Sequence, residues 1–342
     1  MLYVTTRSKL DTYTAHRALY DDRSPEGGFF VPFRMPFYDQ GQLSDLICNG
    51  FSDTVAQVLN QFFSSRITPW DIDCSIGKNP VTIFPASRRI LLARLWNNPQ
   101  GEYGYIENKL YELLCSGEKP EKIANWAKIA IRIAVLFGIY NILNKAQIDT
   151  FDISVASGDF TTPMAVWYAR QMGLPVRMIL CACNESSAPW DLIHRGELNT
   201  AISKSTSVTA ELDASLPENL ERLIYSCFGI NEVNHYLEKV QSKGIYQLRP
   251  DMIQQLNSGM FISVVSKDRI EPLLNSVYRS NNHILDPDTA VSYGSLQDYR
   301  AKTGDSCCTV LLWDRSPMQF ASTVESATKV SRADLTEYLN SF

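Results

Sequence analysis

The order of apolar runs and amphipathic stretches along the chain predicts an α/β fold. In the middle of the chain, an apolar run at 150–156 precedes a helical pattern at 163–173 and a second apolar run at 175–183. Strands that are apolar nearly throughout are typical of parallel sheets with helices on both faces. Two such strands with one helix between them form a right-handed βαβ unit. We therefore predict a parallel sheet flanked by helices.

The same pattern predicts elements on both sides of this unit. We expect further strands at 3–6, 29–31, 81–85, 89–96, 259–268 and 307–314. We expect helices at 13–20, twice within 42–65, and at 105–117, 121–146, 217–229, 233–244, 270–280, from 289 onwards and at 331–342. The two runs at 81–85 and 89–96 are interpreted as paired strands. Residues 1–85 are interpreted as an N-terminal cap and residues 86–342 as the α/β core.

Composition and charge restrict the class of protein. The chain has 342 residues, of which 45% are hydrophobic and 20% charged, and its formal net charge is −5. Basic residues are scattered, so we expect no nucleic-acid partner. The N-terminus lacks the apolar core of a signal peptide, and no run reaches the roughly 20 apolar residues of a membrane helix. We therefore expect a soluble, cytoplasmic protein that does not bind a membrane.

The cysteines and histidines do not predict a metal site. There are eight cysteines and four histidines, without a C-x-x-C pair, an H-x3-H pair or an H-E-x-x-H motif. Cys181 and Cys183 lie inside an apolar run, where small buried thiols are common. We expect structural thiols in a reducing compartment and no bound metal. A P-loop, a G-x-S-x-G and a G-x-G-x-x-G motif are also absent from the sequence.

The turn after the strand at 150–156 is the first candidate for a site. It reads "SGDFTT" at 157–162 and leads into a helix near Pro163. In α/β proteins such a turn often holds a phosphate on the backbone N–H groups of a helix N-terminus. An ionised Asp159 about 4 Å from a phosphate charge would cost roughly 4 kcal/mol at an effective dielectric constant near 20. The alternative is that Asp159 caps the helix that starts at 162–163.

Seven stretches, taken in chain order, resemble threonine synthase, a fold-type II pyridoxal-phosphate enzyme. "YVTTRSK" with "EGGFFVPFRMP" resembles the family's tyrosine–serine–threonine–arginine stretch and its D-G-G-L-F-V-P segment. "SGDFTTPMAVWYARQMGLP" resembles S-G-N-F-G-D with the helix that ends in K-K-M-G-L-P. The other matches are "NWAKIAIRIAVLFGIY", "CNESSAPWDLIHRGEL", "NLERLIY", "HILDPDTAVSYG" and "WDRSPMQF". The matches cover most of the chain and imply a contracted version of the threonine synthase fold.

The resemblance implies a lyase of threonine biosynthesis, which makes threonine from O-phosphohomoserine. The family holds pyridoxal phosphate as a Schiff base on the lysine of an H-G-P-T-x-x-F-K-D segment. The best counterpart here is "WNNPQGEYGYIE" at 96–107, and alignment on Pro99 puts Gly104 at the position of the lysine. Lys109 is the nearest substitute and the one candidate for a catalytic residue. Its alternative role is a solvated position on the helix at 105–117.

The resemblance also implies a set of cofactor-binding positions. The phosphate turn of the family corresponds to Ser157, Gly158, Asp159, Phe160 and Thr161. Thr161 replaces the family's second glycine, and a β-branched residue tolerates left-handed backbone angles poorly. The partner of the pyridine nitrogen corresponds to Asp314 or Ser316.

One family segment has no counterpart in the sequence. After its lysine, the family continues into a substrate-binding S-G-D-T-G loop, whereas this chain passes from "YELLCSGEKPEK" directly into the N-W-A-K helix. We therefore expect the first cofactor subdomain to be largely deleted from the core at 86–342.

These observations leave three functions open. The first is a threonine synthase-like pseudoenzyme without cofactor, which acts by binding or as an assembly partner in a homo-oligomer or with another subunit. The second is a pyridoxal-phosphate-dependent lyase that retains the family activity. The third is a pocket protein for a small amino acid or related ligand, again without cofactor.

Overall fold

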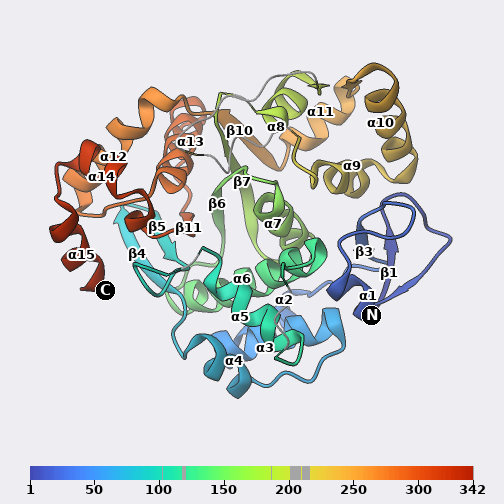
Figure 1. Cartoon of the computed structure of the whole chain (residues 1–342), viewed down its shortest axis with the longest axis horizontal. Coiled ribbons are helices and arrows are strands. Elements are labelled where there is room, and N and C mark those ends of the chain that lie inside the picture. Colours follow the sequence, from blue (N-terminus) through green and yellow to red (C-terminus); the bar gives the residue numbers. More distant parts are fainter. Residues whose placement is uncertain (102, 118–120, 186, 201–208, 210–215, 342) are drawn as a thin grey trace.

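A six-stranded sheet forms the centre of the protein. The computed structural model describes residues 1–101, 103–117, 121–185, 187–200, 209 and 216–341. The strand order is β10-β7-β6-β11-β5-β4, and the first five strands are parallel (Figure 1). In this order the strands are Met260–Val264, Val176–Cys183, Phe151–Ala156, Thr309–Trp313, Ile90–Arg94 and Thr82–Ser87. The α/β prediction is confirmed.

The sheet is mixed, because one edge strand is antiparallel, and the expected pairing of the runs at 81–85 and 89–96 is confirmed. Strand β4 runs antiparallel to β5 at the edge. Only Arg88 and Arg89 separate the two strands, and so short a connection forms a hairpin, because a parallel crossover needs a dozen or more residues.

Helices cover both faces of the sheet. Helices α6 (Asn125–Lys145) and α7 (Thr161–Gln171) pack on one face, and α12 (Ile270–Asn281), α13 (Pro287–Thr303) and α14 (Ala321–Thr328) on the other. The side chains of β7 alternate between these two cores, as strand geometry requires. Cys181 and Cys183 belong to the α6 side, and Leu180 and Ala182 to the α13 side.

The N-terminal residues form a small sheet and four helices. Strands β1 (Leu2–Thr5), β2 (Tyr13–Thr14) and β3 (Phe30–Pro32) pair in the order β2-β1-β3. The helices are α1 (Ala15–Tyr20), α2 (Gln40–Ile47), α3 (Phe51–Phe63) and α4 (Pro69–Ile76). The hydroxyl of Tyr3 donates to the carbonyl of Phe62 and accepts from the indole of Trp126 in α6. This part therefore shares the main core, and its boundary at residue 85 stays a prediction.

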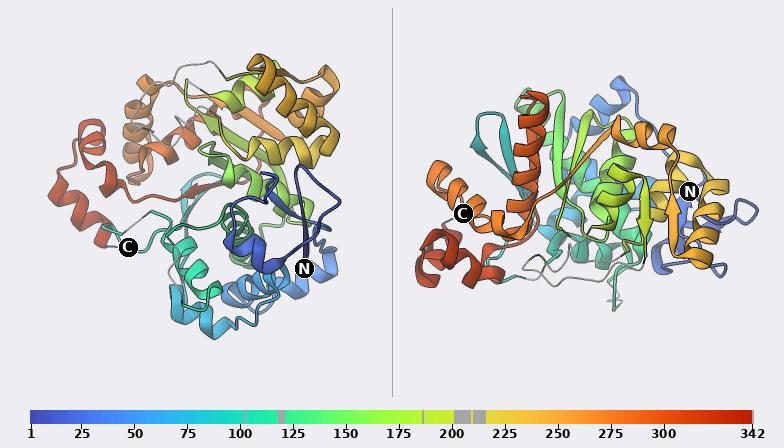
Figure 2. Two further views of the ribbon diagram at one scale, coloured as in Figure 1. Left: turned by 45° about the vertical axis from the view of Figure 1, so that its right-hand side comes forward. Right: turned by 90° about the horizontal axis from the view of Figure 1, so that it is seen from above.

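The remaining elements lie around the central sheet (Figure 2). They are α5 (Tyr105–Leu114), α8 (Ala188–Trp190), a π-helical turn (Asp191–Arg195), β8 (Glu197–Asn199), α9 (Leu220–Phe228), α10 (Ile230–Lys243), β9 (Ile245–Gln247), α11 (Pro250–Asn257), 3₁₀ turns at Lys267–Arg269 and Pro317–Phe320, and α15 (Arg332–Asn340). Between α5 and α6, the described residues at 115–117 and 121–124 form neither helix nor strand. The deletion of a subdomain at this place stays a prediction.

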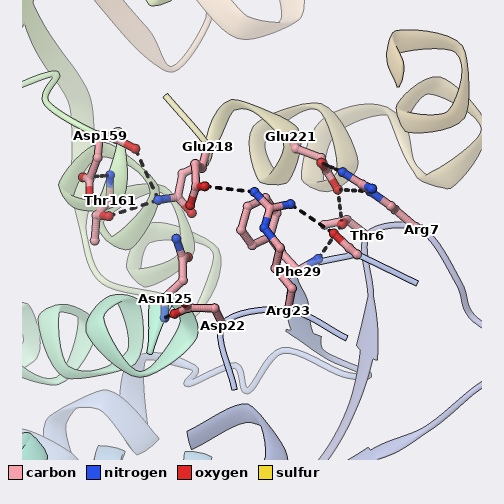
Figure 3. Close-up of polar contacts among 12 residues, drawn as sticks. Thr6, Arg7, Asp22, Arg23, Phe29, Asn125, Asp159, Thr161, Glu218 and Glu221 are labelled. Atoms are coloured by element: carbon pink, nitrogen blue, oxygen red, sulfur yellow. Dashed lines mark hydrogen bonds and ion pairs between the residues drawn. The ribbon is translucent and has the colours of Figure 1, made fainter. Parts of the chain in front are cut away.

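The N-terminal sheet is tied to α9 by charge. The Glu221 carboxylate accepts from Arg7 at 2.8 and 3.1 Å and from the hydroxyl of Thr6 (Figure 3). The guanidinium carbons of Arg23 and Arg222 lie 3.9 and 4.7 Å from the ring centroid of Phe29. These contacts fix α9, which in turn borders the candidate site described below.

Helix α6 is the most apolar helix that the structure describes. It is long and apolar enough to cross a membrane, although the sequence led us to expect no such segment. However, 89% of its apolar window is buried inside the protein, as in the core helix of a globular domain.

Candidate functional site

A cavity of about 50 Å³ lies at the carboxyl ends of β6 and β11. Strand β6 has β7 on one side and β11 on the other, and ligands of open α/β sheets bind where the connections diverge in this way. The lining residues come from both strand ends, from α6, from the segment before α5 and from the N-terminal parts of α7 and α13. They are Tyr103, Lys128, Val155, Ala156, Ser157, Gly158, Asp159, Thr162, Asp286, Asp288, Thr289, Ser292, Leu312, Asp314 and Arg315.

The turn at 157–162 keeps a backbone shape that can present N–H groups. Gly158 and Phe160 have φ angles of 46° and 64°, in the left-handed region. Thr161 is the first residue of α7 and is not left-handed, so the expected strain at Thr161 is a wrong prediction. Phe160 takes the unfavourable angle instead, and its fully buried ring belongs to the α6 core. The helix also begins two residues earlier than predicted.

The Asp159 side chain has two partners, one in this turn and one on α6. Its Oδ1 accepts from the backbone N–H of Thr161 at 2.9 Å, and its Oδ2 lies 3.1 Å from Nζ of Lys128. Desolvation raises the pKa of Asp159, but the charge of Lys128 and the hydrogen bonds from Thr161 outweigh it, so the pKa lies below its ordinary value. Asp159 is therefore ionised at neutral pH, and Lys128 compensates part of its charge.

A buried ion bridge closes the cavity behind this pair. Nε of Arg132 lies 2.8 Å from Glu107 Oε1, and its Nη1 lies 2.6 Å from Asp314 Oδ1. The Arg132 side chain is only 3% exposed. Burial alone would lower the pKa of Arg132, but Asp314 and Glu107 outweigh burial and raise it. The guanidinium therefore stays charged and holds α5, α6 and the end of β11 together.

The opposite wall is also made of paired groups. Nε of Arg315 lies 3.4 Å from Asp288 Oδ2, and its guanidinium carbon lies 4.1 Å from the ring centroid of Tyr103. Asp286 caps α13 by accepting from the N–H groups of Asp288 and Thr289 at 2.9 and 3.1 Å. Burial raises the pKa of Asp286 to about 6.

The structure brings together some of the residues that the sequence singled out. Ser157, Gly158, Asp159 and Asp314 line the cavity. Phe160 and Thr161 do not, although the Thr161 hydroxyl accepts from Asn219, the residue before α9, at 3.0 Å. Ser316 is fully buried beside the cavity, where its Oγ accepts from the N–H of Met318. Whether any of these residues contacts a cofactor stays a prediction.

The lysine that lines the cavity is Lys128 and not Lys109, the candidate that the sequence suggested. Gly104 directly follows the lining residue Tyr103 and starts α5 with a φ of 73°. Lys109 lies further along α5, outside the cavity lining, with its Nζ 2.9 Å from Glu112. Lys128 is the lysine that lines the cavity, and sequence reasoning gave it no role. Its position in the "NWAK" stretch, one helical turn into α6, could have indicated that Lys128 lies near the site.

Comparisons with known proteins show that the chain is similar to threonine synthases. Residues 2–78 match the family described as "Threonine synthase N terminus". The chain is 28% identical to threonine synthase of Pseudomonas aeruginosa over 208 residues, which is 59% of this chain and 43% of that protein. It is 22% identical to human threonine synthase-like 1 over 219 residues, 62% of this chain and 29% of that protein. The match thus spans less than half the length of these relatives.

Solved structures extend the likeness to the fold. A pyridoxal-phosphate-bound threonine synthase from Brucella melitensis superposes with a TM-score of 0.83 at 13% identity, covering 98% of this chain and 94% of that chain. Yeast threonine synthase superposes with a TM-score of 0.81 at 18% identity, covering 95% and 89%. The resemblance to threonine synthases and the α/β architecture inferred from the sequence are confirmed. The contraction of that fold stays a prediction.

Proposed function

We propose that this chain, a threonine synthase-like protein by sequence and fold, no longer carries out aldimine chemistry and acts by binding. One observation carries the proposal: Gly104, which has no amine, stands where sequence alignment places the lysine of the family, beside the cavity lining. Without that amine, no internal Schiff base forms at this position. Action within a homo-oligomer or with another subunit remains part of the proposal.

The cavity residues do not fit pyridoxal phosphate. A cavity of about 50 Å³ is well below the roughly 300 Å³ at which sites for drug-sized ligands begin. The carboxylate of Asp314, proposed as the pyridine-nitrogen partner, is engaged by Arg132. At the phosphate turn, the side chain of Asp159 presents a negative charge. We therefore derive no step through this cofactor.

One observation favours the second candidate, a pyridoxal-phosphate-dependent lyase that makes threonine from O-phosphohomoserine. Lys128 places its side-chain nitrogen in the cavity, where Nζ is paired with the Asp159 carboxylate at 3.1 Å. An ammonium is not a nucleophile, so this lyase requires the pair to open first.

The test is cofactor addition to the purified full-length chain. Pyridoxal phosphate is added, the absorbance spectrum recorded, the mixture reduced with borohydride and the adducts mapped by mass spectrometry. We expect only scattered surface adducts, equal in the wild type and in Lys128→Met and Lys109→Met variants. A stoichiometric adduct on one lysine, lost when that lysine is replaced, would overturn the non-catalytic proposal and support the lyase.

A further inference from the structure

Resting on the proposed binding function, we infer that the ion pair of Lys128 and Asp159 is a site for a small zwitterionic amino acid. The ligand inserts between the two side chains, so that its ammonium meets the Asp159 carboxylate and its carboxylate meets the Lys128 ammonium. The proposal names the ligand class of the cavity and needs no cofactor.

The pair lies where a ligand can reach it. The Asp159 side chain is 50% exposed and that of Lys128 is 31% exposed, whereas Arg132 behind them is 3% exposed. The backbone carbonyl of Asp159 accepts from Asn219, which anchors the turn to α9. Lys128 sits on the long rigid helix α6, but its four-carbon side chain can swing. The two charges can therefore separate without moving the elements that carry them.

Separating Lys128 from Asp159 costs less free energy than separating the neighbouring pair of Arg132 and Asp314. An exposed ion pair contributes little to stability, so parting Lys128 from Asp159 costs little. Parting Arg132 from Asp314 would leave buried charges without partners, which is costly. A zwitterion gives each of the two separated groups a new partner of opposite charge.

Charge in the cavity selects against ligands with a single charge. Four lining carboxylates belong to Asp159, Asp286, Asp288 and Asp314, against the cations of Lys128 and Arg315. An anion would meet Lys128 but face these carboxylates. A simple amine would take Asp159 and leave the Lys128 ammonium without its partner. A ligand with both charges at the spacing of an α-amino acid avoids both costs.

The cavity also sets the size of the side chain. Its volume of about 50 Å³ corresponds to about four water-sized groups. Four serine and threonine residues contribute to its lining, namely Ser157, Thr162, Thr289 and Ser292. The site therefore takes amino acids from glycine to serine or threonine and excludes aromatic and long aliphatic ones.

The test is isothermal calorimetry on the full-length chain without cofactor. The probes are glycine, L-alanine, L-serine and L-phenylalanine, with ethylamine, acetate and phosphate as single-charge controls. We expect the three small amino acids to bind and the other probes not to bind. Binding should weaken about tenfold or more in Asp159→Asn and Lys128→Met, since each removes one charge-assisted contact. Lys109→Met, which removes a lysine outside the cavity, should bind as the wild type does.

Three results would overturn the inference. They are no binding of any small amino acid, equal binding by Asp159→Asn, or binding of ethylamine as strong as that of alanine. If Lys128→Met fails to fold, Lys128→Gln and Asp159→Asn provide the same comparison. This assay contains no pyridoxal phosphate, so its failure leaves the absence of aldimine chemistry intact. A lysine adduct in the cofactor test would count against the proposed function instead.

Discussion

The ammonium of Lys128 lies 3.1 Å from the carboxylate of Asp159, across the turn that joins β6 to α7. In the resembling family this turn faces the cofactor phosphate, and here a carboxylate and an ammonium of the chain face each other. A second set of paired charges lies behind the cavity, where Arg132 joins Glu107 to Asp314. Paired charges of the protein thus line the cavity and close it from behind.

The buried bridge predicts a large loss of stability in Arg132→Met. The substitution leaves Glu107 and Asp314 without their shared cation, and breaking a buried pair typically costs about 3–5 kcal/mol. Urea unfolding measures the change. Arg17→Met is the matched control, because the ion pair of Arg17 with Asp21 is half-exposed and contributes under about 1 kcal/mol. Equal losses in the two variants would show that the bridge is not a stabilising contact.

Restoring a lysine at position 104 should not restore the aldimine. The φ of 73° at Gly104 disfavours any L side chain, so Gly104→Lys should cost about 1 kcal/mol of folding free energy. Gly117→Lys is the matched control, since Gly117 has a φ of 86° and open space around its missing Cβ. We expect similar destabilisation of both variants and no aldimine absorbance in either. An aldimine band confined to Gly104→Lys would mean that the cavity still accepts the cofactor.

Some elements of the fold could be predicted from the sequence and others could not. The strands of the βαβ unit and most helices could be predicted from the spacing of apolar residues, because the buried face of each element sets that spacing. Helix α4 was missed although Thr68 and Asp71 form a capping box that marks its start. The left-handed angle at Phe160 had no local signal, since packing of its buried ring holds it. The role of Lys128 depends on a partner 31 residues away, which periodicity cannot reveal.

The raised pKa of Asp286 predicts a specific dependence of stability on pH. Its pKa is about 6 in the folded protein against 3.8 in the unfolded chain, so the folded state binds the proton more tightly. The contribution of this group is therefore fully present below about pH 4 and is lost as pH rises through about 6, by at most roughly 3 kcal/mol. Asp286→Asn keeps a good helix cap and removes the titration.

The measurement is the free energy of unfolding of both proteins across this pH range. The wild type should lose stability relative to Asp286→Asn between about pH 4 and about pH 6. A constant difference across the range would contradict the account of Asp286. Groups with lowered pKa values, such as Asp159, act in the opposite direction in both proteins and cancel in the comparison.

The docking of the N-terminal sheet predicts that Glu221→Gln is destabilising. The change weakens two contacts with Arg7 and one with Thr6 at a nearly buried carboxylate, and we expect a loss of about 2 kcal/mol. Glu218→Gln is the control, because the ion pair of Glu218 with Arg23 is partly exposed and should contribute under about 1 kcal/mol. Thermal unfolding compares the two, and equal melting temperatures would argue against the proposed anchor.

We propose that this chain has lost the aldimine chemistry of the family. The most direct test is the intact mass of the full-length chain after incubation with pyridoxal phosphate and borohydride reduction. Our account predicts a mass distribution without a dominant single adduct, and no difference between the wild type and Lys128→Met. A single stoichiometric adduct that disappears in Lys128→Met would contradict it and identify Lys128 as a Schiff-base lysine.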